Sequence, residues 1–149
     1  MSAKADTSRI TITGPGLTTP IENTAPNVLA KFRVWAGPMT SSNEAESLIV
    51  NWAQGAVADR PKGLSRYQVS FYVKNKQKNE EYLVYVVFYE FDPANAQGYV
   101  YVPGRTDEQY ERNTFSIYHG VEGNTFRAWQ AWEDVAKPLI AKAKDRSRE

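Results

Sequence analysis

The clearest pattern along the chain is an alternation of apolar and polar residues between positions 66 and 74. Apolar residues occupy positions 67, 69, 71 and 73, and the residues between them are mostly polar, which is typical of a strand with one dry and one wet face. Residues 82–91, YLVYVVFYEF, are apolar on both faces and indicate a central strand. The polar residues 75–79 between them predict a solvated hairpin turn.

Shorter segments extend this predicted sheet. Residues 9–13 alternate isoleucine with arginine or threonine, and Gly14-Pro15-Gly16 ends that strand. Pro26 is suited to the first turn of a short helix that continues through residues 28–32. Further strand candidates are residues 20–23, 48–52, 99–102 and 113–118.

The apolar period changes from two to about 3.6 residues after Asn124, which predicts a C-terminal helix capped by that residue. Pro138 removes a backbone hydrogen bond inside the pattern, so we expect it to kink or divide the helix. The predicted apolar stripe consists of Phe126, Trp129, Trp132, Ala136, Leu139, Ile140 and Ala143.

These elements predict an α+β fold, in which a largely antiparallel sheet of about six to eight strands packs against a C-terminal helix. A β-sandwich with a terminal helix is the alternative. The chain of 149 residues fits a single domain, 1–149, with residues 1–8 and 144–149 as flexible polar tails.

Composition narrows the possible functions. Lys and Arg total 18 against 17 acidic residues, a net charge of +1, so we expect no nucleic-acid partner. With no cysteine and one histidine, the sequence offers no metal site built on those ligands. Gly14-Pro15-Gly16 lacks the third glycine of a dinucleotide loop, and no Walker sequence occurs, so we expect no cofactor. No apolar run reaches the roughly 20 residues of a membrane helix, so we expect no membrane insertion.

His119 and Glu122, in the segment YHGVEGN, are the candidate catalytic residues. An imidazole beside a carboxylate could serve as a general base for a nearby serine. The alternative is a turn from the last strand into the helix, and it is favoured because no nucleophile motif accompanies the histidine.

Aromatic residues are the other candidate site. Tyr99 and Tyr101 share one face of their strand, and with Trp35 and Trp52 they could form a stacking surface for a ligand. The alternative is that most aromatic residues pack beneath the helix, since large rings are usually well buried.

Phrases such as ITITGPGLTTPIE, GLSRYQVSFYV, VYVVFYEFDPANAQGYVYVPG and GVEGNTFRAWQAWEDVAKPLIAKA resemble a family of small uncharacterised bacterial proteins, over residues 10–143. A signal peptide often precedes the domain in that family, which implies a mature, extracytoplasmic form. The chain itself shows no signal peptide, so a cytoplasmic setting is the alternative. The resemblance implies no activity, cofactor or catalytic residue.

We therefore expect a non-enzymatic binding or interaction module from a bacterial exported protein, with a small molecule, a glycan or a protein as its partner. One alternative is an acid/base hydrolase that uses His119 with Glu122. The other is a structural protein that self-associates through exposed strand edges.

Overall fold

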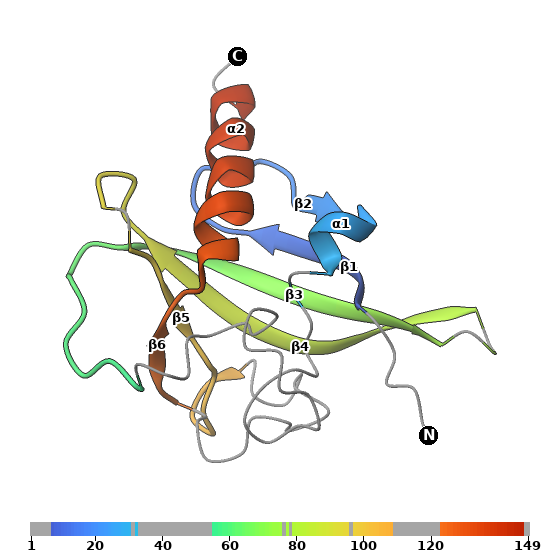
Figure 1. Ribbon diagram of the computed structural model, residues 1–149, viewed down its shortest axis with the longest axis horizontal. Coiled ribbons are helices and arrows are strands. Elements are labelled where there is room, and N and C mark those ends of the chain that lie inside the picture. The colour runs from blue at the N-terminus through green and yellow to red at the C-terminus, as the bar shows by residue number, and fades with distance from the viewer. Residues whose placement is uncertain are drawn as a thin grey trace.

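An antiparallel sheet forms the larger of two layers (Figure 1). The computed structural model describes residues 7–30, 32, 55–75, 77, 79–95, 97–108 and 123–147. Six strands lie within these ranges in the order β2-β1-β3-β4-β5-β6, and each neighbouring pair is antiparallel. The strands are β1 (Thr7–Thr13), β2 (Ile21–Asn23), β3 (Ser65–Asn75), β4 (Glu80–Phe91), β5 (Tyr99–Tyr101) and β6 (Thr125–Arg127).

The long hairpin of β3 and β4 forms the middle of the sheet. Its register pairs Tyr67 with Tyr89 on one face and Arg66 with Glu90 on the other. A bulge next to Phe71 leaves Val84 as an extra residue in β4, so the same alternation continues on both sides of it. The predicted central hairpin is therefore confirmed.

Helices cover one face of this sheet, which we call the helix face (Figure 1). They are α1 (Pro26–Leu29), the π-helical segment η4 (Trp132–Ala136) and α2 (Lys137–Ser147). The predicted α+β arrangement is confirmed. In the described residues no helix is long and apolar enough to cross a membrane.

Pro138 changes the helix where the sequence predicts a break. It has no N–H to donate to Asp134, and its ring would crowd the carbonyl group of that residue in a regular α-helix. The preceding turns widen instead, and the Lys137 N–H donates to the Trp132 carbonyl oxygen five residues earlier. The helix thus divides into a π-helical and an α-helical part.

The helix does not begin after Asn124, as its sequence predicts. Residues Thr125–Arg127 form β6, in which Phe126 pairs with Val100 of β5. The tertiary pairing overrides the helical spacing of Phe126, because its ring is buried equally well on the helix face of a strand. Helical structure starts at Gln130.

Stacked aromatic rings form the centre of the core. Trp132 is 1% exposed, and its ring lies 4.9 Å from that of Tyr89 and 5.0 Å from that of Phe32. Tyr89 also stacks on Phe91 at 5.0 Å. The expectation that most aromatics pack beneath the helix is confirmed for Tyr85, Tyr89 and Phe91, which are all buried.

The Glu133 carboxylate joins the helix to the sheet. Its Oε1 accepts hydrogen bonds from the Tyr89 hydroxyl at 3.1 Å and the Gly98 N–H at 2.9 Å, and Lys137 Nζ lies 2.8 Å from Oε2. Burial, followed by the Glu133 charge, raises the pKa of Tyr89. A Cβ at Gly98 would come within 2.6 Å of Oε1, so only glycine allows this close approach.

Tyr67 and Tyr89, which face each other across the hairpin, offer a matched test of these hydroxyl groups. In the described residues the buried Tyr67 hydroxyl has no hydrogen-bond partner, whereas that of Tyr89 binds Glu133. We expect Tyr67→Phe to raise the free energy of unfolding by about 0.5–1 kcal/mol and Tyr89→Phe to lower it by about 1–2 kcal/mol. Urea denaturation followed by tryptophan fluorescence measures both, and equal losses would contradict the assignment.

Candidate binding face

The described residues include two of the predicted site residues, Tyr99 and Tyr101. Tyr99 and Tyr101 lie on the sheet face opposite the helices, here called the far face, and both are half-buried. They are therefore not part of the core beneath α2. The other candidates, His119, Glu122, Trp35 and Trp52, lie outside the described residues, as do the predicted strands 48–52 and 113–118.

A row of polar side chains crosses four strands of the far face. Arg66 of β3 pairs directly with Glu90 of β4, Glu90 with Tyr99 of β5, and Tyr99 with Arg127 of β6. Directly paired residues project from the same face, with Cβ atoms about 4.5–5.5 Å apart. These four residues, named here the cross-strand row, bring together segments that are up to 61 positions apart in the sequence.

Glu90 is a buried carboxylate between two arginines. It is 5% exposed, and Arg66 Nε donates a hydrogen bond to its Oε2 at 2.7 Å. Arg60 Nε lies 3.0 Å from Oε1 without hydrogen-bond alignment, and Arg60 Nη1 donates to Thr125. Both arginine side chains remain more than a third exposed, at 36% and 42%. Glu90 therefore fixes two guanidinium groups that still reach solvent.

The Arg66 guanidinium lies over two aromatic rings. Its Cζ is 4.5 Å from the centroid of Phe88 and 4.9 Å from that of Tyr101, and these two rings are 6.3 Å apart. A cation over a ring face gains about 0.5–1 kcal/mol at an exposed site. The rings and Glu90 together define one orientation of Arg66.

Asp107 holds the Tyr101 ring in place. Its Oδ2 accepts hydrogen bonds from the Tyr101 hydroxyl at 2.6 Å and from the Gly104 N–H at 2.8 Å. These two bonds, with a smaller effect of the Arg66 charge, lower the pKa of Asp107. Burial and then the Asp107 carboxylate raise the pKa of Tyr101. At neutral pH the pair is thus a carboxylate and a neutral phenol.

Two members of the cross-strand row, Arg127 and Tyr99, differ from Arg66 and Glu90 in their side-chain hydrogen bonds and ion pairs. Arg127 and Tyr99 are half-buried neighbours, and in the described residues neither the guanidinium nor the hydroxyl has a hydrogen-bond or ion-pair partner. A half-buried cation without a counter-charge has lost part of its hydration without compensation. Within the described residues, the donors at this corner of the far face therefore have no acceptor.

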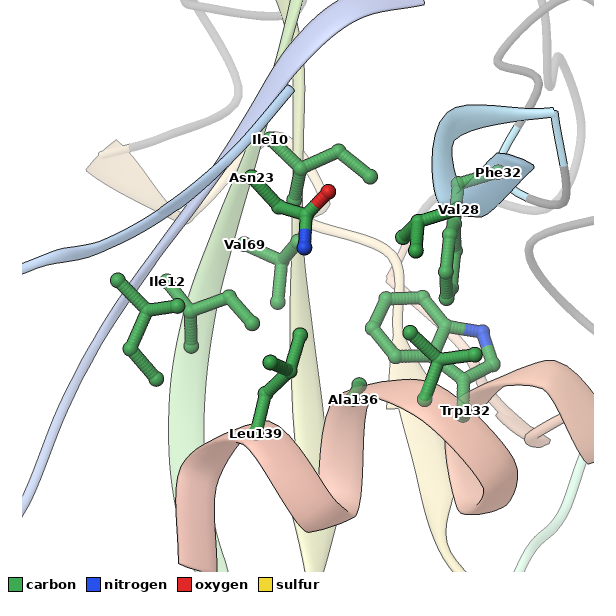
Figure 2. Close-up of a pocket in the computed structure, with 11 residues that line it drawn as sticks. Ile10, Ile12, Asn23, Val28, Phe32, Val69, Trp132, Ala136 and Leu139 are labelled. Atoms are coloured by element: carbon green, nitrogen blue, oxygen red, sulfur yellow. The ribbon is translucent and has the colours of Figure 1, made fainter. Parts of the chain in front are cut away.

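A small cavity on the helix face is lined by apolar side chains, in contrast to the polar cross-strand row. Figure 2 shows side chains from β1, β2, β3, the α1 region and the C-terminal helical segments converging on it, with Val69, Trp132 and Leu139 among them. Its volume is about 10 Å³, roughly the space of one water molecule, and its lining is almost wholly apolar. It is a packing gap rather than a ligand pocket.

Metal binding and proton transfer are the other chemistries that acidic side chains on the described surface would support. In that part of the chain no three His, Cys, Asp or Glu residues are placed to hold a metal ion. The two carboxylates next to the aromatic rings, Glu90 and Asp107, are both engaged by donors. A general base needs an available lone pair within reach of a substrate proton. Glu90 Oε1 accepts no hydrogen bond in the described residues, but it is buried, and both hydrogen bonds to Asp107 end on its Oδ2.

Most residues of this face carry no distinctive signal in the sequence. Arg60, Arg66, Asp107 and Arg127 each look like an ordinary surface charge. One signal was present, because Glu90 is the only charged residue in the apolar run YLVYVVFYEF. A buried carboxylate requires donors, so its presence indicates a polar cluster even though it does not identify the partners.

We expect Glu90→Gln to lower the free energy of unfolding by about 2 kcal/mol, because it leaves two guanidinium groups beside a neutral amide. The matched control is Glu81→Gln on the same strand, since Glu81 also binds an arginine, Arg9, at 2.8 Å, but in a more exposed position. The control should lose about 0.5 kcal/mol. Urea denaturation of both variants at neutral pH provides the comparison, and equal losses would show that burial of Glu90 adds nothing.

Asp107 should make stability depend on pH. Because its pKa is lowered in the folded state, its contribution is complete above its ordinary value of 3.8 and is lost as pH falls through the folded pKa. We expect Asp107→Asn to cost about 1 kcal/mol at pH 7 and less at pH 3. The exposed Asp145→Asn control should change stability by less than about 0.5 kcal/mol at either pH. A penalty that stays constant down to pH 2 would contradict this role.

Comparison with known proteins identifies no family for the chain. No family model, no curated protein and no solved structure matches it. The resemblance to small bacterial proteins therefore stays a prediction. What can be said of function rests on the geometry of the far face.

Proposed function

We propose that the protein is a non-enzymatic binding module and that the far face around the cross-strand row is its binding face. The observation that carries the proposal is the fixed position of Arg66, which is oriented by Glu90 and by the rings of Phe88 and Tyr101 while 42% of its side chain stays exposed. Side chains that are already ordered lose little entropy when a ligand binds. Such a group on a rigid sheet suits recognition.

The neighbouring tyrosines supply the second element of a binding face. Tyr99 and Tyr101 are half-buried, so part of each side chain is accessible, and β5 pairs with strands on both sides. Aromatic rings offer large contact areas at low entropic cost, and a nearby arginine adds directional hydrogen bonds. The combination fits a small molecule, a glycan or a peptide segment that carries both polar and flat groups.

The alternative functions draw less support from the described residues. The acid/base hydrolase depends on His119 and Glu122, which lie outside them, so it stays a prediction. Self-association through strand pairing needs a free edge. The outer side of β6 already pairs with Ala56, and the Val57 N–H donates to the Thr125 carbonyl at 2.7 Å, so within the described residues the other edge is β2, a strand of three residues. The exported bacterial setting likewise stays a prediction that rests on the sequence resemblance.

A titration of the ¹⁵N-labelled protein with four trisaccharide probes tests the binding face. The probes are maltotriose, cellotriose, trigalacturonate and the chitosan trimer, which cover neutral, anionic and cationic sugars. We expect at least one probe to shift the amide signals of Tyr99, Tyr101 and Arg127 by NMR. Tyr99→Ala should weaken that binding about tenfold, because stacking on one aromatic ring contributes about 1–3 kcal/mol.

The matched control is Tyr82→Ala, which removes an exposed tyrosine from the distant end of β4. It should leave the affinity unchanged. Signal shifts that gather on α2, or binding that survives Tyr99→Ala, would place any site elsewhere. If none of the four probes shifts the far-face signals, the proposed binding face is wrong for carbohydrate ligands. The same titration with acidic and basic tripeptides then tests peptide binding, and the absence of far-face shifts there would contradict the proposal for peptides too.

A further inference from the structure

We propose that the binding face selects an oxyanion, a carboxylate or phosphate group held between Arg127 and Tyr99, and that the exposed amino groups of Arg66 bind a second anionic group of a longer ligand. This inference rests on the proposed function and adds the chemical class of the ligand. Its basis is the placement of Arg127 and Tyr99, which lie directly opposite each other across β5 and β6 and have no partner in the described residues. An arginine fork and a phenolic hydroxyl side by side are complementary to a single oxyanion.

The charge balance of this region favours an anion. Three arginines, Arg60, Arg66 and Arg127, lie on this part of the far face, against the carboxylates of Glu90 and Asp107. Among these five described side chains, three positive charges and two negative ones leave a net charge of +1. Half-buried charges are less screened by salt than fully exposed ones, so the excess acts on a ligand at close range.

The hydrogen bonds inside the cluster leave the Nη groups of Arg66 and the guanidinium of Arg127 without an acceptor in the described residues. Arg66 uses Nε for Glu90, and no described residue accepts from its two Nη groups. The Asp107 carboxylate is occupied by Tyr101 and Gly104, so it does not compete for Arg127. Glu90 repels an incoming anion only weakly, because it is 5% exposed and covered by two guanidinium groups.

The distance between Arg66 and Arg127 limits which ligands can contact both residues. Arg66 and Arg127 stand three strand spacings apart, about 14 Å between Cα atoms at about 4.8 Å per strand. Tyr99 lies next to Arg127, and the Arg66 guanidinium leans over Tyr101 of the same strand. A ligand with one anionic group contacts the Arg127 corner, and a chain of anionic units can reach both arginines.

Three probes separate the possible sources of the anion. Trigalacturonate carries carboxylates on a sugar chain, inorganic phosphate is a free anion, and maltotriose is a neutral sugar of similar size. In a phosphate-free buffer, we expect trigalacturonate to shift the amide signals of Tyr99 and Arg127 and to bind at least about tenfold more tightly than maltotriose. Phosphate should shift the signals of Arg127 and Tyr99 as well, but should bind more weakly than trigalacturonate. Raising the salt from about 0.1 M to 1 M shortens the screening length from about 10 Å to 3 Å and should weaken both anions.

Arg127→Gln is the decisive variant. It removes a guanidinium that has no partner in the described residues, so the fold should tolerate it, and circular dichroism with urea denaturation checks this. We expect trigalacturonate affinity to fall about tenfold or more. Arg127→Lys keeps the charge but not the fork and should recover part of the loss. Lys142→Gln on α2 makes the same change in net charge on the opposite side of the sheet and should change nothing.

The outcomes distinguish this inference from the proposed function. If maltotriose binds the far face as tightly as trigalacturonate and Arg127→Gln has no effect, the binding face stands and its selection of anions is wrong. If Arg127→Gln and Lys142→Gln weaken trigalacturonate equally, only net charge matters and the site is again wrong. If no probe shifts the far-face signals, both proposals are overturned for these ligands. Should Arg127→Gln fail to fold, the comparison of Arg127→Lys with the wild-type protein decides the same question.

Discussion

The structure depends above all on the register of the β3–β4 hairpin. Because side chains alternate between faces, pairing Tyr67 with Tyr89 places both beneath the helix and directs Arg66 and Glu90 to the far face. A slip of one residue would exchange the faces, burying the Glu90 carboxylate against Trp132 and exposing Tyr89. The aromatic core and the polar cluster therefore specify the same register from opposite sides.

Each face of the sheet holds a carboxylate that is largely shielded from solvent and paired with donors. On the helix face, Glu133 is ion-paired with Lys137 and accepts hydrogen bonds from Tyr89 and Gly98. On the far face, Glu90 lies between Arg60 and Arg66. A buried carboxylate needs such partners, because an uncompensated charge costs several kcal/mol. The two differ in what they leave accessible, since the arginines around Glu90 still reach solvent.

The sequence predicts the fold better than the site, for physical reasons. Alternation over 66–74 and the apolar run 82–91 are local patterns, and they correctly predict β3 and β4 as the centre of an antiparallel sheet. The predicted start of the C-terminal helix was wrong, because Phe126 of β6 pairs with Val100, a residue distant in the sequence. The cross-strand row combines residues from four strands, so only the register reveals it. The shared face of Tyr99 and Tyr101 could be predicted, because residues two positions apart in a strand project from the same face.

The positions of Tyr99 and Tyr101 depend on contacts from both faces of a very short strand. β5 has only three residues, which by themselves provide few ladder hydrogen bonds. Glu133 binds the N–H of Gly98 just before the strand, and Asp107 binds the hydroxyl of Tyr101 at its end. Carboxylates on opposite sides of the sheet thus fix the two ends of β5. Packing of the helix and the positions of the tyrosines are consequently coupled through one strand, which explains how a core on one face of the sheet can order side chains on the other.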